Sequence, residues 1–563
     1  MLHRNSKAEK ISSIPKLAVD YWTVSIMNQE ELDNALVILS KMVRQMKVIR
    51  FTFYSPINNP YSELNLFKSL ESGENLQCLV LDMRGYSSFN CPQLHQIISK
   101  VKSIRSLIIK RTKSEETAKQ FAKLIAETSY IRYISLNNAF VNAEYFKQFS
   151  INRSVQFLHL KQCTIDENTW KTLCGIISST NTLKTIEVRP IEEPKFLTDF
   201  CEALKKARSI KEVITDSYLF EKPLIFEEFL SAIEQSPCES LTIVKYTPSP
   251  NTRSVLSNFI KNTKTLKHLQ LGKIKVKHNV AFTKEKTVVE HVDQADIDAL
   301  ANALQSNKTL IGLRLNGWST SQDVSMKQFA EMLKSNVTLL TLDMSYSYWG
   351  QYALKDISEA IAATNTLKKL NLRRLMSSNW PTLIDALIKN KSLTSVDLSE
   401  SVELRTSTAL YIENVTIELI KKLIENNTTL RELKFQAKNL SENEIVDLLP
   451  SLKHNDSLTS VDILAPKQAR YLPNQPVLKL TSELVADVFS TNYSIVNLNI
   501  HFSWKRLFDK YLKRNRQHRV DLIVMLHNLF RSQYTILPDE IWRHIFSFIG
   551  YYVGLIDIVM LKK

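Results

Sequence analysis

The side chains that usually carry catalysis or bind metal are scattered along this sequence. Six cysteines (Cys78, Cys91, Cys163, Cys174, Cys201 and Cys238) all lie in the first half, without a C-x-x-C pair or a His-flanked cluster. This spacing argues against a zinc module and a disulfide scaffold, and it is typical of buried thiols in a reducing compartment. The sequence also has no phosphate-binding glycine loop, G-x-S-x-G elbow or H-E-x-x-H motif. We therefore expect no catalytic residues, no metal site and no cofactor, and thus no enzyme.

The composition is that of a folded protein with a large core. Of 563 residues, 44% are hydrophobic and 23% are charged, and only 9 glycines and 16 prolines interrupt the chain. The N-terminus has no apolar stretch of the kind found in signal peptides. The longest apolar run, Phe548 to Met560, contains Asp557 and is shorter than the roughly 20 residues of a transmembrane helix. We expect one continuous architecture, located in the cytoplasm and without a transmembrane segment.

An internal repeat explains most of the chain. The frame L-x-x-L-x-L recurs 17 times, often 28 residues apart, starting at Tyr21, Val48, Leu76, Ile104, Ile131, Val155, Leu183, Ile210, Leu241, Leu266, Leu310, Leu339, Leu367, Leu393, Leu430, Leu458 and Ile495. Each frame alternates apolar and polar residues like a strand, and a stretch with helical spacing follows it. One strand and one helix of this size cannot bury their apolar faces alone, so the repeats must stack.

The stacking predicts an α/β horseshoe with a parallel sheet on its concave face and helices outside. We expect residues 1–20 to lead into a solenoid of residues 21–503, followed by a helical C-terminal segment over residues 504–563. The chain has N-x-S/T sequons, for example at Asn307, Asn336, Asn414 and Asn492, and many frames are preceded by N-x-T-L or N-x-S-L, as at Asn307, Asn336, Asn390 and Asn427. A polar turn after each helix accounts for these sequons without glycosylation.

Over roughly residues 20 to 515 the frame resembles the ribonuclease-inhibitor-like leucine-rich repeats. The family's ladder residue after the last strand leucine is kept at Cys163 but is replaced by Ala139, Trp318 and Ser347 in other repeats. The resemblance implies a solenoid that binds another protein.

The polar third, fifth and seventh positions of each frame should face the concave side. They hold nine basic residues (Arg50, Lys110, Lys161, Arg189, Lys245, Arg314, Lys369, Arg373 and Lys434) and eight acidic ones (Asp82, Glu187, Glu212, Asp216, Asp343, Asp397, Glu432 and Asp462). These charges nearly cancel, although the formal charge of the chain is +16. A nucleic-acid groove needs a stripe of one sign. We therefore predict a protein partner and no specific nucleic acid.

The repeats from residue 310 to 398 are the predicted contact surface. Concave positions contribute Arg314, Asp343, Lys369, Asn371, Arg373 and Asp397, and the adjoining loops contribute Trp318, Tyr346 and Trp349. Aromatic residues among polar ones are common interface anchors. The alternative is that these rings pack over the strand ends as part of the core, as we expect for Trp380.

Two features mark the C-terminal end. Residues 503–519 carry seven Lys or Arg against Asp509, which suits a capping helix or, alternatively, contact with phosphate or anionic lipid. From residue 536 the chain resembles the opening of an F-box, with Leu537, Pro538, Ile541, Ile545 and Phe546 at matching positions. That resemblance implies docking on the Skp adaptor of a cullin ubiquitin ligase; the alternative is a helical cap.

The combination also resembles the leucine-rich-repeat effectors of Legionella-type intracellular bacteria. Those proteins are rich in Lys, Asn, Ile and Leu, lack signal peptides and often have an apolar residue near the C-terminus, here Leu561. The resemblance implies type IV secretion and action on a host protein in the host cytosol.

Overall fold

A computed structural model of the chain has two compact units, residues 1–272 and 273–563. We call them the N-terminal unit and the C-terminal unit. The residues described are 21–26, 29–54, 65–84, 94–112, 115–216, 218–244, 246, 249–272, 292–321, 323–375, 379–399, 417–435, 446–463, 482–499 and 507–521.

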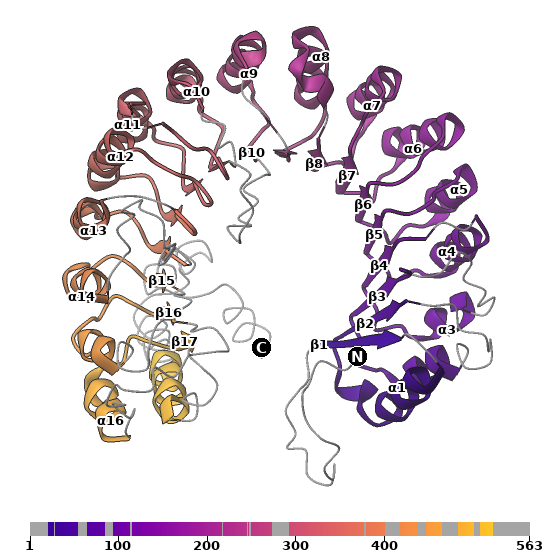
Figure 1. Cartoon of the computed structure of the whole chain (residues 1–563), viewed down its shortest axis with the longest axis horizontal. Coiled ribbons are helices and arrows are strands. Elements are labelled where there is room, and N and C mark those ends of the chain that lie inside the picture. The colour runs from indigo at the N-terminus through magenta and orange to yellow at the C-terminus, as the bar shows by residue number, and fades with distance from the viewer. Residues whose placement is uncertain are drawn as a thin grey trace, which may run out of the picture. The chain divides into compact units, whose positions relative to one another are not determined.

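The N-terminal unit contains a parallel sheet whose strands pair in chain order (Figure 1). The strands are β1 (Tyr21–Ile26), β2 (Val48–Phe53), β3 (Cys78–Asp82), β4 (Ser106–Lys110), β5 (Tyr133–Asn137), β6 (Phe157–Lys161), β7 (Thr185–Arg189), β8 (Glu212–Thr215), β9 (Ser240–Ile243) and β10 (His268–Leu271). Outside them lie α1 (Gln29–Met42), η1 (Val43–Gln45), η2 (Ser69–Ser72), α3 (Leu94–Lys100), α4 (Glu115–Glu127), α5 (Ala143–Ile151), α6 (Glu167–Ser179), α7 (Pro194–Lys206), η3 (Tyr218–Glu221), α8 (Pro223–Gln235) and α9 (Pro250–Asn262).

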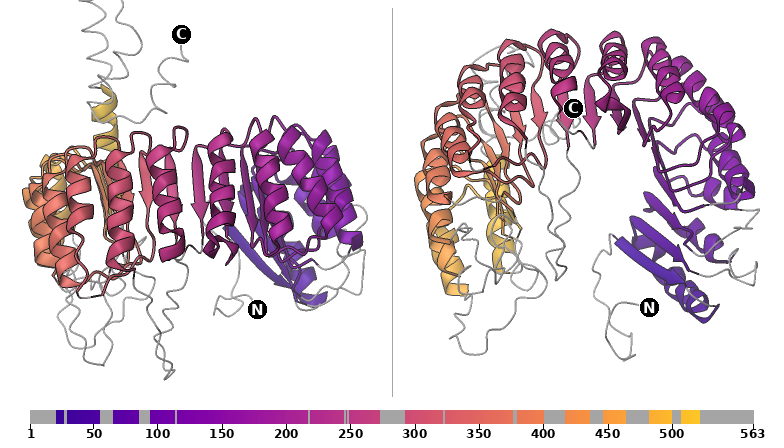
Figure 2. Two further views of the ribbon diagram at one scale, coloured as in Figure 1. Left: turned by 90° about the horizontal axis from the view of Figure 1, so that it is seen from above. Right: turned by 45° about the horizontal axis from the view of Figure 1, so that its top comes forward.

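The C-terminal unit repeats this plan with shorter strands. Its parallel strands, again paired in chain order, are β11 (Gly312–Arg314), β12 (Thr341–Asp343), β13 (Lys369–Asn371), β14 (Ser395–Asp397), β15 (Glu432–Lys434), β16 (Ser460–Asp462) and β17 (Asn497–Asn499). Its helices are α10 (Gln294–Ser306), α11 (Lys327–Ser335), α12 (Gln351–Ala363), α13 (Trp380–Lys389), α14 (Ile417–Asn426), η4 (Leu449–Leu452) and α16 (Ser482–Thr491). In each unit the helices stand side by side along one face of the sheet (Figure 2).

Strand register confirms the predicted frame in most repeats and corrects it in three. Val48 pairs with Cys78, and Tyr21 pairs with Val48. The first two frames therefore begin two residues earlier than predicted, so that Met46 takes the first position of the second repeat. Because side chains alternate with a period of two, Phe51 and Phe53 stay on the core face, whereas Val48 moves from the first position of the frame to the third, on the opposite face of the strand. In β9, Ser240 pairs with Glu212, so the frame begins at the buried Cys238 and not at Leu241.

Buried asparagines join several helix ends to the next repeat. Asn390 donates through Nδ2 to the carbonyls of Ile361 (2.6 Å) and Thr364 (3.0 Å), and its Oδ1 accepts from the Leu393 amide (2.6 Å). The same arrangement recurs at Asn152, Asn336, Asn427, Asn455 and Asn492. Helices leave their last carbonyls without intrahelical donors, and the asparagine side chain supplies one. The sequons at Asn307, Asn336 and Asn492 are therefore buried turn residues, as predicted, whereas Asn414 lies outside the described residues.

The helical residues 507–521 cover the last repeat of the C-terminal unit. Phe508 and Leu512 are buried, and Phe508 contacts Phe489 of α16 edge to face. Arg514 donates to the carbonyls of Phe489 (2.6 Å) and Asn492 (2.9 Å). The predicted capping role is confirmed for residues 507–521, because Phe508 and Leu512 cover the core of the last repeat and the Arg514 guanidinium group satisfies carbonyls at the end of the stack.

Candidate functional site

The concave face is the face of each sheet opposite the helices, and it carries the third, fifth and seventh frame positions. In the C-terminal unit it presents the exposed Arg314 and Lys369 and the half-buried Asp343, Asn371, Arg373 and Asp397. Hydrogen bonds across three successive strands fix part of this surface. Asp343 accepts from Nδ2 of Asn316 (3.3 Å) and from Nδ2 of Asn371 (2.9 Å), one repeat to each side. Its Oδ1 also accepts from the Ser345 amide (3.0 Å).

A left-handed residue follows the seventh position in several repeats and continues the strand ladder. Tyr346 has φ 60° and donates its amide to the Arg373 carbonyl (2.8 Å), and Arg374 has φ 54° and donates to the Ser399 carbonyl (2.9 Å). Gly317 (φ 77°) occupies the same position in the repeat before Tyr346. Non-glycine residues rarely adopt this conformation, and the backbone hydrogen bond to Arg373 stabilises it at Tyr346. The guanidinium carbons of Arg373 and Arg374 lie 5.8 and 5.2 Å from the centre of that ring.

Two predicted contact residues lie in the interior. Trp318 is 6% exposed and Trp349 is 1% exposed, and both line one apolar pocket together with Met326, Phe329 and Met344. They therefore belong to the core of the loop layer and are not exposed anchors. This corresponds to the alternative of ring packing over the strand ends. Trp380 is fully buried as well, as predicted.

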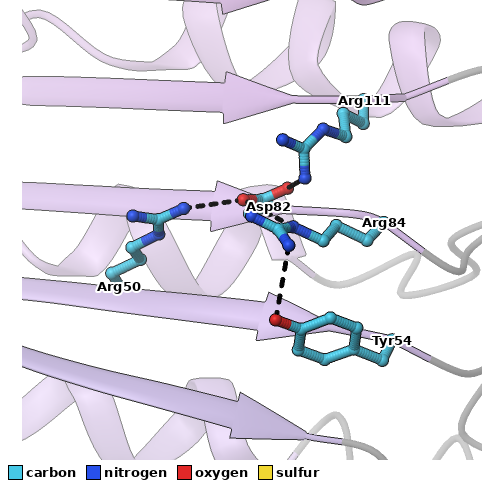
Figure 3. Close-up of polar contacts among 5 residues, drawn as sticks. All are labelled: Arg50, Tyr54, Asp82, Arg84 and Arg111. Carbon is cyan, nitrogen blue, oxygen red and sulfur yellow. Dashed lines mark hydrogen bonds and ion pairs between the residues drawn. The ribbon is translucent and has the colours of Figure 1, made fainter. Parts of the chain in front are cut away.

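In the N-terminal unit the buried Asp82 lies among three arginines (Figure 3). Its carboxylate accepts from Nη2 of Arg50 on β2 (2.8 Å) and from Nη1 of Arg111 after β4 (3.0 Å). Nε of Arg84 lies 3.6 Å from the same carboxylate. The Arg84 guanidinium also stacks over Tyr54 at 5.4 Å and donates to its hydroxyl (3.4 Å). We call these five residues the Asp82 cluster.

A second buried acid, Glu187 on β7, has a similar set of neighbours. It contacts His159 of β6, and its carboxylate lies 3.1 Å from Nζ of Lys161 and 2.5 Å from Nε of Arg189. Burial by itself raises the pKa of Glu187, but the contact with His159 and the charges of Arg189 and Lys161 outweigh it and hold the pKa below its ordinary value.

Counting charges from sequence conceals their uneven exposure. From β2 to β7 the acids at concave positions are Asp82 and Glu187, and both are buried beneath basic side chains. The charge that this face presents to solvent is therefore positive, although the counted charges nearly cancel. Lys245 is a concave base in the frame from Leu241, but in the frame that begins at Cys238 it follows the seventh position, and it lies outside the described residues.

Sequence reasoning missed Arg84 and Arg111, because both follow the last concave frame position. The available signal was Asp82 itself, since Arg50 and Arg111 lie 32 and 29 residues from it. These separations are about one repeat in each direction, so stacking brings all three residues together.

The thiols and histidines do not form a reactive group in the described part of the chain. Burial raises the pKa of Cys174, Cys201 and Cys238 to about 12. Across the described ranges, no three His, Cys, Asp or Glu side chains are placed to hold a metal ion. His159 contacts Glu187, His268 is exposed on β10, and His501 lies outside the described residues.

The predicted adaptor residues Leu537, Pro538, Ile541, Ile545 and Phe546 lie outside the described residues. No helix within the described ranges combines the length and apolar character needed to cross a membrane.

The leucine frame, the parallel strands with helices on one face and the asparagine turns make the protein an α/β leucine-rich-repeat solenoid. No protein-family model and no curated protein matches the sequence.

Similar solved structures include the Rad7 and Elc1 complex in yeast, at 15% identity and a TM-score of 0.38, covering 81% of this chain and 94% of that chain. The TLR13–ssRNA13 complex has 17% identity and a TM-score of 0.32, covering 76% of this chain and 59% of that one. The mouse RP105/MD-1 complex has 12% identity and a TM-score of 0.37, covering 85% and 77%.

Proposed function

We propose that the protein is a non-enzymatic scaffold that binds a partner protein on the concave face of the C-terminal unit. The contact surface comprises Arg314, Asp343, Tyr346, Lys369, Asn371, Arg373 and Asp397. The observation that carries the proposal is the Asp343 network, in which one carboxylate is held by amides from the repeats on both sides.

Charge and order both support a protein ligand for this surface. Both signs of charge alternate over neighbouring strands, as in an interface that selects a partner by complementary charge. Side chains that are already hydrogen-bonded lose little conformational entropy on binding. The stack holds them on strands, which keep their spacing better than loops do.

Proximity labelling with the full chain in a candidate host cell would identify partners, and a charge-reversal pair would test the surface. Lys369→Glu combined with Arg314→Glu should abolish capture of the labelled partner. Lys327→Glu combined with Lys355→Glu is the matched control, because these lysines are exposed on the helices α11 and α12 and the pair undergoes the same charge change. Equal capture by all variants would refute the proposed surface.

We also propose, as a second function, that the protein is a substrate receptor of a cullin ubiquitin ligase. This proposal rests on the F-box-like residues Leu537, Pro538, Ile541, Ile545 and Phe546 in the sequence. Full-length protein should then form a complex with a purified Skp adaptor. Leu537→Glu with Ile541→Glu should abolish that complex, and Asp539→Ala should not. An adaptor that fails to bind the wild-type chain would exclude this function.

We propose further that the protein reaches a host cytosol by type IV secretion, as the resemblance to Legionella-type effectors implies. A translocation reporter fused to the N-terminus of the chain should then be delivered by a secreting strain. Delivery should cease in a strain without the secretion system; unchanged delivery there would contradict this route.

A further inference from the structure

The Asp82 cluster carries more positive charge than its carboxylate can balance. Three guanidinium groups surround one carboxylate, so the formal charge of the cluster is 3 − 1 = +2. Lys110 adds a further positive charge beside it, because it pairs with Asp82 in the register of β3 and β4. A structural ion pair alone would need only one of these cations.

The buried carboxylate fixes the directions of the three arginines. It draws Arg50 and Arg111 from opposite sides, while Arg84 lies between them and rests against Tyr54 (Figure 3). A carboxylate offers about four lone-pair sites, whereas each guanidinium has about five N–H donors. The three guanidinium groups therefore have more donors than the Asp82 carboxylate can accept. The Arg84 and Arg111 side chains remain 40% and 39% exposed, whereas Asp82 is fully covered. A ligand arriving from solvent therefore meets guanidinium groups and not the acid.

We propose that the Asp82 cluster binds a phosphate monoester carried by a partner protein, such as a phosphoserine side chain. This inference rests on the proposed protein-binding function and specifies the chemistry of one contact. The surplus charge of +2 matches the charge of a phosphate monoester, about −1.5 to −2 at neutral pH. Guanidinium groups also bind phosphate oxygens in a bidentate geometry, and clustered arginines are a common binding site for phosphorylated side chains.

The distribution of charge favours this focal ligand over a nucleic-acid backbone. A backbone needs cations spread evenly along its path. Here the cations gather around Asp82 and, separately, around Glu187. Between these groups, β5 places the uncharged Tyr133, Ser135 and Asn137 on the concave face.

Fluorescence polarisation with the full chain would test the site. The probe is a fluorescein-labelled peptide of uncharged residues around one phosphoserine. Arg84→Gln and Arg111→Gln should each weaken binding about tenfold or more, because each removes a charge-assisted contact. Arg84→Lys should weaken binding less, since the positive charge remains and only the bidentate geometry of the guanidinium group is lost. Arg208→Gln is the matched control, because Arg208 is exposed in the turn between α7 and β8.

Several results would overturn the inference. They are failure of the wild-type chain to bind the phosphopeptide, equal binding of the unphosphorylated peptide, and stronger competition by single-stranded poly-uridine RNA than by the phosphopeptide. Equal loss in Arg208→Gln would also overturn it. Thermal melting monitored by circular dichroism would verify that every variant is folded.

The outcome for the Asp82 cluster is separable from that for the contact surface of the C-terminal unit. If Lys369→Glu with Arg314→Glu loses partner capture and the wild-type chain does not bind the phosphopeptide, the protein-binding function stands and only the phosphate site is refuted. If those two substitutions leave partner capture unchanged, the proposed contact surface is refuted, whether or not the phosphopeptide binds.

Discussion

Replacing Asn427 by alanine should open the stack locally between the turn that follows α14 and the end of α13. Its buried side chain donates to the Leu387 carbonyl at 2.7 Å and accepts from the amides of Thr429 (2.9 Å) and Leu430 (2.8 Å). Alanine leaves these three backbone groups without their partner. Each buried polar group that loses its hydrogen bond costs about 1–3 kcal/mol, and Thr429 is only half-buried, so the total is roughly 3–5 kcal/mol.

The neighbouring Asn426 provides the control. It ends α14 with an exposed side chain that donates to the Lys422 carbonyl of its own helix at 2.8 Å. Asn426→Ala removes the same atoms one residue away, and we expect a change in the free energy of unfolding within about 0.5 kcal/mol.

Hydrogen exchange followed by mass spectrometry suits this comparison, because long repeat proteins need not unfold in one step. Amides of residues 417–435 should exchange at least about 100-fold faster in Asn427→Ala than in wild type, as expected for a loss of 3 kcal/mol or more. Exchange should stay near wild type in Asn426→Ala. Similar exchange in both variants would refute the reasoning that buried asparagines join the repeats.

Three further predictions concern other parts of the core. The folded-state pKa of Glu187 lies below its ordinary value near 4.5. The stability that Glu187 contributes is therefore present above that pH and is lost as the pH falls through the lower folded-state value. A pH series of melting temperatures should show a smaller decrease at acid pH in Glu187→Gln than in wild type. Cys174, Cys201 and Cys238, with pKa values of about 12, should resist iodoacetamide at pH 8 until urea unfolds the chain, and mass spectrometry locating label on them in the native protein would contradict their burial. Trp349→Ala should cost about 3–5 kcal/mol through a cavity in the core, and a melting temperature equal to that of wild type would show that the ring is not packed as described.

The sequence by itself determined the repeat and the layers. Leucines at fixed spacing can be buried only against the next repeat, so parallel strands with helices on one face follow from the pattern. The sequence could not determine the frame in the first two repeats, because a strand shifted by two residues keeps the same faces. At the ninth strand Cys238 takes the place of a leucine, and the run that begins at Leu241 imitates the frame.

Only the tertiary structure decided which polar and aromatic groups reach solvent. Trp318 and Trp349 look like anchors in the sequence, yet they fill the space above the strand ends. Asp82 counts as one negative charge, but residues 32 before and 29 after it cover it with guanidinium groups. Such contacts form between repeats, and their exposure depends on side-chain volumes and directions in the neighbouring repeat. Spacing along the chain specifies which residues can meet, and packing in three dimensions decides which of them is covered.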